Sequence, residues 1–111
     1  MVRYQTQKPI EPKVIIEKPI ETHRILSEPV YTTQQEVLLI VKDVEYSEVT
    51  LNSSINTKIT IKSLTSVLIR PDKGLIDAEW DELLLEKGAC VQFEFVEGDW
   101  YILSSDGLKM S

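Results

Sequence analysis

The single histidine, His23, and the single cysteine, Cys90, are the residues of this sequence best suited to nucleophilic catalysis. His23 lies in a proline-punctuated N-terminal stretch, and no histidine follows it, so the second half of the chain cannot build a Ser-His-Asp or Cys-His arrangement. Cys90 alternates with Val91 and Phe93, which places it on the opposite face of a strand. A small residue packed at an interface or second face is therefore the better interpretation of Cys90 than a nucleophile.

Carboxylates gather between two apolar stretches: Asp72, Asp77, Glu79, Asp81 and Glu82. Oxygen ligands of this type bind calcium, but their spacing matches no calcium loop and Trp80 interrupts the series. Nothing beyond their number supports a glycosidase pair. The four glycines each mark a separate turn, so the sequence has no glycine-rich phosphate loop. We therefore predict no enzymatic activity, no metal site and no cofactor.

Aromatic side chains offer one binding chemistry, because Trp80 and Tyr101 are candidates for a platform that stacks on a sugar ring. In an alternating strand Trp100 and Tyr101 face opposite sides, so one ring is buried and the other points outward or into an interface. Trp100 follows a turn at Gly98-Asp99 and opens the last strand, where one large ring can close a small core. Core or subunit-interface packing is the competing interpretation of these rings.

Size and charge restrict the function further. The chain has 111 residues, which suffices for one domain, and a domain this small is marginally stable by itself, so we expect it to form oligomers. A net charge of −6 and a pI of about 4.8 argue against a nucleic-acid partner and against an anionic membrane surface. No apolar run approaches the length of a membrane span, and residues 1–5 show no secretory signal. With one cysteine there is no intrachain disulfide, and assembly in a reducing cytoplasm is expected.

The composition changes near Gln35, and we predict an extended arm over residues 1–35. Four of the five prolines precede this point, and three of them, Pro9, Pro19 and Pro29, recur ten residues apart in similar words. Proline lacks an amide donor and favours extended neighbours, so neither a helix nor a central strand is expected. The arm has balanced charge and is rich in Ile and Val, unlike a solvated linker. A flexible tail is one interpretation, and an arm that lies along a partner surface is the other. The predicted anchoring residues are Pro9, Ile10, Val14, Ile15, Ile16, Pro19, Ile20, Pro29, Val30 and Tyr31.

Residues 36–111 have the pattern of a small all-β domain, sandwich-like or jelly-roll-like. Val37–Val41 is an apolar run of buried-strand length, and Lys58–Lys62 alternates with both isoleucines on one face. Glu97-Gly98-Asp99 predicts a hairpin turn. Several short strands with turns between them are typical of a sandwich. Residues 78–87 are the exception, because an acidic start and Gly88 at the end also suit a capped helix.

The stretch from about Glu48 to Lys109 resembles a β-rich module of head-fibre, tail-fibre and other appendage proteins of tailed bacteriophages. The elements that carry the resemblance are Val49–Leu51, Ile59–Leu64, Val67–Pro71, Leu75–Ala78, Leu83–Leu85, Gly88–Phe93 and Trp100–Gly107. Their order and spacing are the informative feature, since no single element is specific. Ala78 stands where that family usually has Gly, at a tight turn. The resemblance implies a sandwich-like module, often trimeric, without a shared active site, and favours a turn followed by a strand over residues 78–87.

These observations predict a structural protein of a virion, assembled in the host cytoplasm. In this hypothesis the chain is a head-fibre, decoration or fibre-base component. Its arm attaches to other virion proteins, such as capsid or portal-proximal proteins, and its β domain forms a homo-oligomer, expected to be a trimer. A receptor- or glycan-binding module at a fibre tip is the alternative, and a cellular scaffold domain unrelated to viruses is a third. Apolar residues after the prolines favour an anchor over a spacer.

Overall fold

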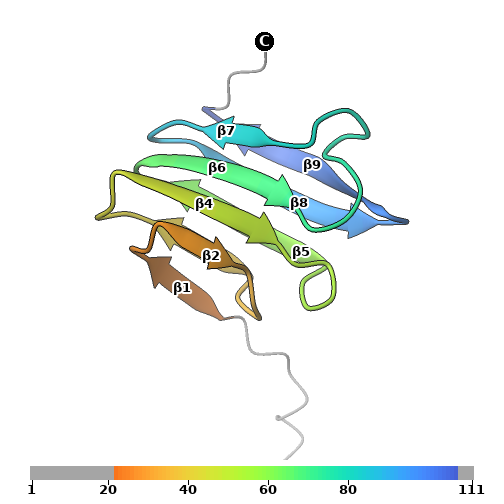
Figure 1. The fold of residues 1–111 in the computed structure, drawn as a ribbon, viewed down its shortest axis with the longest axis horizontal. Coiled ribbons are helices and arrows are strands. Elements are labelled where there is room, and N and C mark those ends of the chain that lie inside the picture. The colour runs from red at the N-terminus through yellow and green to blue at the C-terminus, as the bar shows by residue number, and fades with distance from the viewer. Residues whose placement is uncertain (1–21, 108–111) are drawn as a thin grey trace, which may run out of the picture.

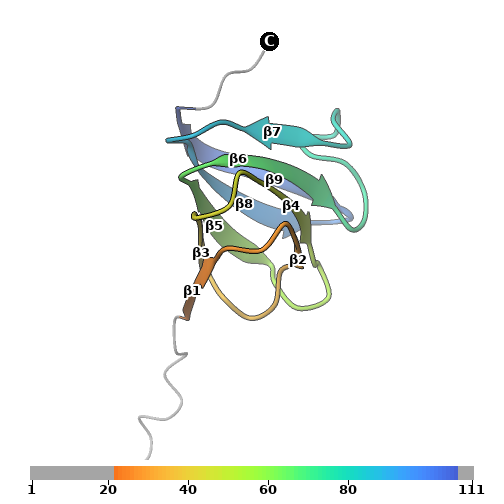
Figure 2. The same cartoon turned by 60° about the vertical axis from the view of Figure 1, so that its left-hand side comes forward.

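The computed structural model describes residues 22–107, which form two facing β-sheets and no helix (Figure 1). The nine strands are β1 (His23–Leu26), β2 (Val30–Thr32), β3 (Leu38–Val41), β4 (Tyr46–Leu51), β5 (Lys58–Ser63), β6 (Ser66–Pro71), β7 (Leu83–Leu85), β8 (Cys90–Val96) and β9 (Asp99–Asp106). Five strands form sheet A in the order β1-β3-β5-β8-β9, and four form sheet B in the order β2-β4-β6-β7. The predicted all-β sandwich is confirmed, and Figure 2 shows its two layers.

The first six strands alternate between the sheets, so the chain winds as a coil. β1, β3 and β5 pair in parallel in sheet A, and β2, β4 and β6 pair in parallel in sheet B. Parallel neighbours need a long crossover, and here each crossover contains a strand of the opposite sheet. After β6 the pairing becomes antiparallel, with β7 added to sheet B and β8 and β9 to sheet A. The coil distinguishes this sandwich from the antiparallel connections of a jelly roll.

Period-two alternation builds the core between the sheets. The inward side chains of both sheets are fully or almost fully buried: Leu39, Val41, Ile59, Ile61, Val91, Phe93 and Trp100 from sheet A, and Val49, Leu51, Val67, Ile69, Leu83 and Leu85 from sheet B. Ile59 and Ile61 share the inner face, and Trp100 points inward while Tyr101 does not, as the alternation predicted. Burying such side chains at roughly 25 cal/mol per Å² is the main stabilising term of the fold.

The predicted boundary at residue 35 does not match the sheets, because β1 and β2 lie before it. Pro29 explains how a proline-containing segment joins them. It occupies the turn between β1 and β2, where its missing N–H costs no ladder bond. Its carbonyl accepts the N–H of Glu48 at 2.8 Å. Residues 22–35 of the predicted arm therefore belong to the β domain, and residues 1–21 of the arm lie outside the described residues.

The segment that suited either a helix or a strand is a turn followed by β7, as the resemblance implied. Ile76 pairs with Trp80 through bonds in both directions, of 2.7 and 3.0 Å. Asp77 and Ala78 between them have φ of 54° and 57°. Local propensity for a helix is overridden here because Leu83 and Leu85 pair with Ile69 and Val67 of β6 and bury their side chains.

Candidate interaction surface

Strands β1 and β2 form the free edges of the two sheets at the N-terminal end of the coil (Figure 1). Leu26 of β1 accepts the N–H of Lys42, and Thr33 after β2 donates to Thr50, each at 2.9 Å. Alternate residues of a strand direct their backbone groups to opposite neighbours. The N–H and C=O groups of Ile25 and Val30 therefore face the free edge, where residues 22–107 supply no further strand.

The side chains at this edge are apolar as well. Ile25 is 55% exposed and Val30 is 69% exposed, the two highest values among the large hydrophobic side chains of the described residues. Ile25 lies beside Ile40 on the outer side of sheet A, and Val30 lies on the outer side of sheet B. An edge with free backbone groups and exposed apolar side chains is a template for adding another strand.

A buried carboxylate holds this edge in place. Glu36 is 3% exposed, and its Oε1 accepts bonds from the Tyr31 hydroxyl at 3.1 Å and from Arg24 Nε at 3.4 Å. Its Oε2 accepts the N–H of Gln34 at 3.0 Å. Burial, followed by the hydrogen bond and charge of Glu36, raises the pKa of Tyr31 to about 12. The guanidinium of Arg24 also lies 5.4 Å from the centre of the Tyr31 ring. The edge is therefore a fixed surface rather than a loose end.

The opposite edge of sheet A is covered by the chain itself. Trp100 N–H donates to Leu75 at 2.9 Å, and Asp77 N–H donates to Trp100 at 2.7 Å, so residues 75–77 line part of β9. The Asp77 carboxylate accepts the N–H of Ile102 at 2.9 Å. The indole N–H of Trp100 donates to Asp72 at 3.3 Å. Burial acts to raise the pKa of Asp72, but its hydrogen bonds, with Ser53 first among them, outweigh that and lower it.

Trp80 and Tyr101, the predicted sugar platform, occupy different settings. Trp80 is half-buried and packs against the core beside Ile76. Tyr101 is half-exposed on the outer side of sheet A, where Glu94 is its partner on β8. The two rings come from a loop packed on the core and from an outward strand face, which does not make a common stacking surface.

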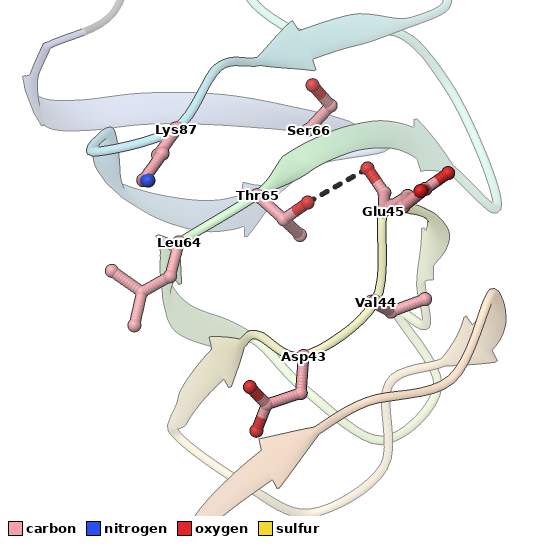
Figure 3. Close-up of a pocket in the computed structure, with 7 residues that line it drawn as sticks. All are labelled: Asp43, Val44, Glu45, Leu64, Thr65, Ser66 and Lys87. Atoms are coloured by element: carbon pink, nitrogen blue, oxygen red, sulfur yellow. Dashed lines mark hydrogen bonds between the residues drawn. The ribbon is translucent and has the colours of Figure 1, made fainter.

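A pocket with a volume of about 510 Å³ lies where turns of the coil follow one another. It is lined by Asp43, Val44, Glu45, Leu64, Thr65, Ser66 and Lys87 (Figure 3). The hydroxyl of Thr65 donates to the carbonyl of Glu45 at 2.9 Å and joins two turns. The Asp43 carboxylate and the Lys87 ammonium lie well apart in Figure 3. The lining therefore provides turn contacts and no converging set of catalytic groups.

A second hollow of about 230 Å³ lies beside the free edge, lined by Thr22, His23, Arg24, Gln34, Gln35, Glu36 and Ile55.

His23 is exposed on β1, and Cys90 is half-buried on β8 opposite Lys62. Within residues 22–107, no three His, Cys, Asp or Glu side chains are grouped to hold a metal ion. The same part of the chain has no helix that could cross a membrane.

The predicted anchors divide between the two parts of the chain. Pro29, Val30 and Tyr31 are described, and Val30 is at the free edge while Tyr31 turns toward Glu36. The others lie outside the described residues: Pro9, Ile10, Val14, Ile15, Ile16, Pro19 and Ile20. Sequence reasoning missed Ile25 as an edge residue and Glu36 as its support. The available signal was the ten-residue spacing, which aligns Ile15 with Ile25.

No protein-family model matches the chain, and the search of curated proteins found no match either.

Proposed function

We propose that this chain is a non-enzymatic structural protein that assembles through its free β1/β2 edge, and that the assembly is the virion of a tailed bacteriophage. In this proposal the chain is a head-fibre, decoration or fibre-base component. It joins copies of itself, three in the simplest case, and contacts other virion proteins.

The observation that carries the proposal is the free edge. Ile25 and Val30 expose apolar side chains beside unpaired backbone groups, on strands fixed by the Glu36 contacts. A soluble protein normally blunts such an edge with charge, proline or a bulge. Leaving it intact and continuous with residues 1–21 suits a protein whose task is to join other chains.

The virion assignment draws its support from the resemblance to phage appendage modules. The elements that carry it correspond in order to β4, β5, β6, the turn at Asp77-Ala78, β7, β8 and β9. That correspondence favours this class over an unrelated scaffold domain, because it covers the whole antiparallel half of the fold and part of the coil.

Particle composition tests the proposal. Particles purified from the source that encodes the chain should contain it at a fixed copy number by quantitative mass spectrometry, and a particle reconstruction should locate the two-sheet domain on the head or tail. Light scattering of the isolated protein at micromolar concentration should give a homo-oligomer. Abundant chain in the lysate with none in the particles would overturn the virion assignment, and a folded monomer would overturn self-assembly.

A further inference from the structure

A proline-containing segment before residue 22 repeats the sequence pattern that forms the free edge, and each nine-residue copy of this pattern is called a word. Residues 23–31, which contain β1, the turn and most of β2, have the sequence HRILSEPVY, and residues 13–21, ten positions earlier, have KVIIEKPIE. The earlier word places Ile15 and Ile16 where β1 has Ile25 and Leu26. It also places Ile20 after its proline, as Val30 follows Pro29. The apolar positions of an edge unit are thus present a second time.

The observed pairing of β2 with β4 shows how such a word binds a parallel strand. Val30 lies opposite Glu48, and the carbonyl of Pro29 accepts the Glu48 N–H at 2.8 Å. Moving this pattern one strand outward sets Ile20 opposite Val30, with the carbonyl of Pro19 accepting the Val30 N–H. Proline contributes only its carbonyl in this pairing, so its missing N–H is no obstacle.

Side chains match in the same register. Ile15 would lie beside the exposed Ile25, and Ile20 beside the exposed Val30, which partly covers the two most exposed large hydrophobic side chains of the described residues. Lys18 would lie beside Glu28 in the turn that joins β1 and β2, which brings opposite charges together. Both sheets would gain a strand from one nine-residue word.

A chain cannot place this word on its own edge. The hydroxyl of Thr22 donates to the carbonyl of Gln35, and the carbonyl of Thr22 accepts the N–H of Val37, both at 2.9 Å, so Thr22 lies at the start of β1. The fold uses residues 33–37 to return from β2 to β3. A word ending at residue 21 beside β2 would leave Thr22 alone to make that return.

We propose that residues 13–21 of a second copy add as a strand pair to the free edges of β1 and β2. The inference rests on the proposed self-assembly and names the segment and the surface that perform it. Because donor word and acceptor edge are different surfaces, the contact is heterologous and builds a ring or a chain of copies unless two copies exchange words reciprocally.

Disulfide trapping in the full-length chain tests the contact. Opposed residues of neighbouring strands lie within the Cα separation that a disulfide requires. With Cys90→Ser as the background, a chain carrying Ile20→Cys is mixed with a chain carrying Val30→Cys and oxidised. The expected product is a covalent heterodimer, with residues 20 and 30 joined in the peptide map. The matched control replaces Ile20→Cys by Ile10→Cys, which follows Pro9 ten residues before Ile20 and lies outside residues 13–21, and should trap far less.

Three results would overturn the proposal: no heterodimer, equal trapping from Ile10→Cys, or an intrachain bridge in a chain that carries both Ile20→Cys and Val30→Cys. Copies present in particles without the cross-link would refute this contact and leave the proposed function intact. A cross-link in protein that is absent from particles would refute the virion assignment and leave this contact intact.

Charge reversal provides a second test, because restoration of self-association in a mixture of variants is not expected if Lys18 and Glu28 only support the fold. Lys18→Glu and Glu28→Lys should each weaken self-association by about two- to fivefold, since like charges then lie side by side. An equimolar mixture of the two variants should restore it, because every contact between unlike chains pairs opposite charges. Lys8→Glu is the control and should change nothing. Lack of restoration in the mixture would refute the pairing of Lys18 with Glu28.

Discussion

The two outer edges of sheet A are built in opposite ways. At β9 the chain covers its own edge: residues 75–77 bond to the backbone of Trp100 and Asp77 accepts the N–H of Ile102. A bulge at Leu103 also interrupts the pairing of β9 with β8. At β1 and β2 the pairing is regular and parallel, and apolar side chains stand exposed. Bulges and covering loops are the devices that prevent edge-to-edge association. The chain thus protects the β9 edge of sheet A and leaves the edges at β1 and β2 available for assembly.

This difference separates residues that maintain the fold from residues that serve contact. Trp100 supports the covered edge from inside the core, whereas Ile25 and Val30 contribute little to that core. Variants at the covered edge should therefore change the free energy of unfolding. Variants at the free edge should change association instead.

Trp100→Ala should give the largest effect, a loss of about 3–5 kcal/mol, comparable with the whole stability of a domain this small. The side chain is fully buried, packs 5.3 Å from the Phe95 ring and bonds to Asp72. Insoluble protein or a flat urea transition is the expected result. Tyr101→Ala, the next residue on the outer face, is the matched control and should stay folded. Equal losses of stability from Trp100→Ala and Tyr101→Ala would mean that burial of the Trp100 ring is not what stabilises the covered edge.

Gly74→Ala should follow, with a loss of about 2–3 kcal/mol. A Cβ at residue 74 would lie 1.9 Å from the carbonyl oxygen of Gly98, so the loop that covers β9 would have to move. Gly98→Ala provides the comparison, because Gly98 also has positive φ but its Cβ would meet nothing within 4 Å. It should lose only about 1 kcal/mol. Urea midpoints decide the matter, and similar losses would exclude close packing as the reason for Gly74.

Ala78→Gly should stabilise the covered edge by about 1 kcal/mol. Ala78 has φ of 57°, a conformation that costs an L side chain about 1–2 kcal/mol and glycine almost nothing, although glycine gains freedom in the unfolded chain. The loop would then keep its bonds to β9 with less strain. Thermal and urea unfolding measure the gain. A loss of stability would show that the Ala78 methyl group makes a contact worth more than the strain.

Strand positions and buried faces could be predicted from the sequence because both depend on local periodicity. The alternation over Lys58–Lys62 fixed which isoleucines point inward, and Gly98 identified a two-residue hairpin turn, whose φ values are 47° at Glu97 and 95° at Gly98. The left-handed backbone at Ala78 was harder to foresee, since alanine disfavours it and the bonds from Asp77 to β9 maintain it.

Strand partners could not be predicted in the same way. Periodicity states which face a residue takes, but parallel pairing of β1 with β3 depends on contacts between segments fifteen residues apart. Pro29 also suggested an extended arm, although a proline in the turn between two sheets is compatible with a strand in each sheet. The free edge could not be predicted because Ile25 becomes an edge residue only through the pairing of β1 with the outer side of β3.

The smallest effect on stability, and the sharpest test of the comparison, is expected from Ile25→Lys combined with Val30→Lys. Both side chains are more than half exposed, so the free energy of unfolding should change by no more than about 0.5 kcal/mol for each. Lysine on an edge strand, however, opposes the addition of another strand, so light scattering should show dissociation toward a monomer. Leu103→Lys is the control, because Leu103 is 50% exposed at the bulge of the covered edge and should leave the oligomer unchanged. If Leu103→Lys dissociates the copies and the double variant does not, the roles of the two edges are reversed, and β9 rather than β1 and β2 carries the assembly.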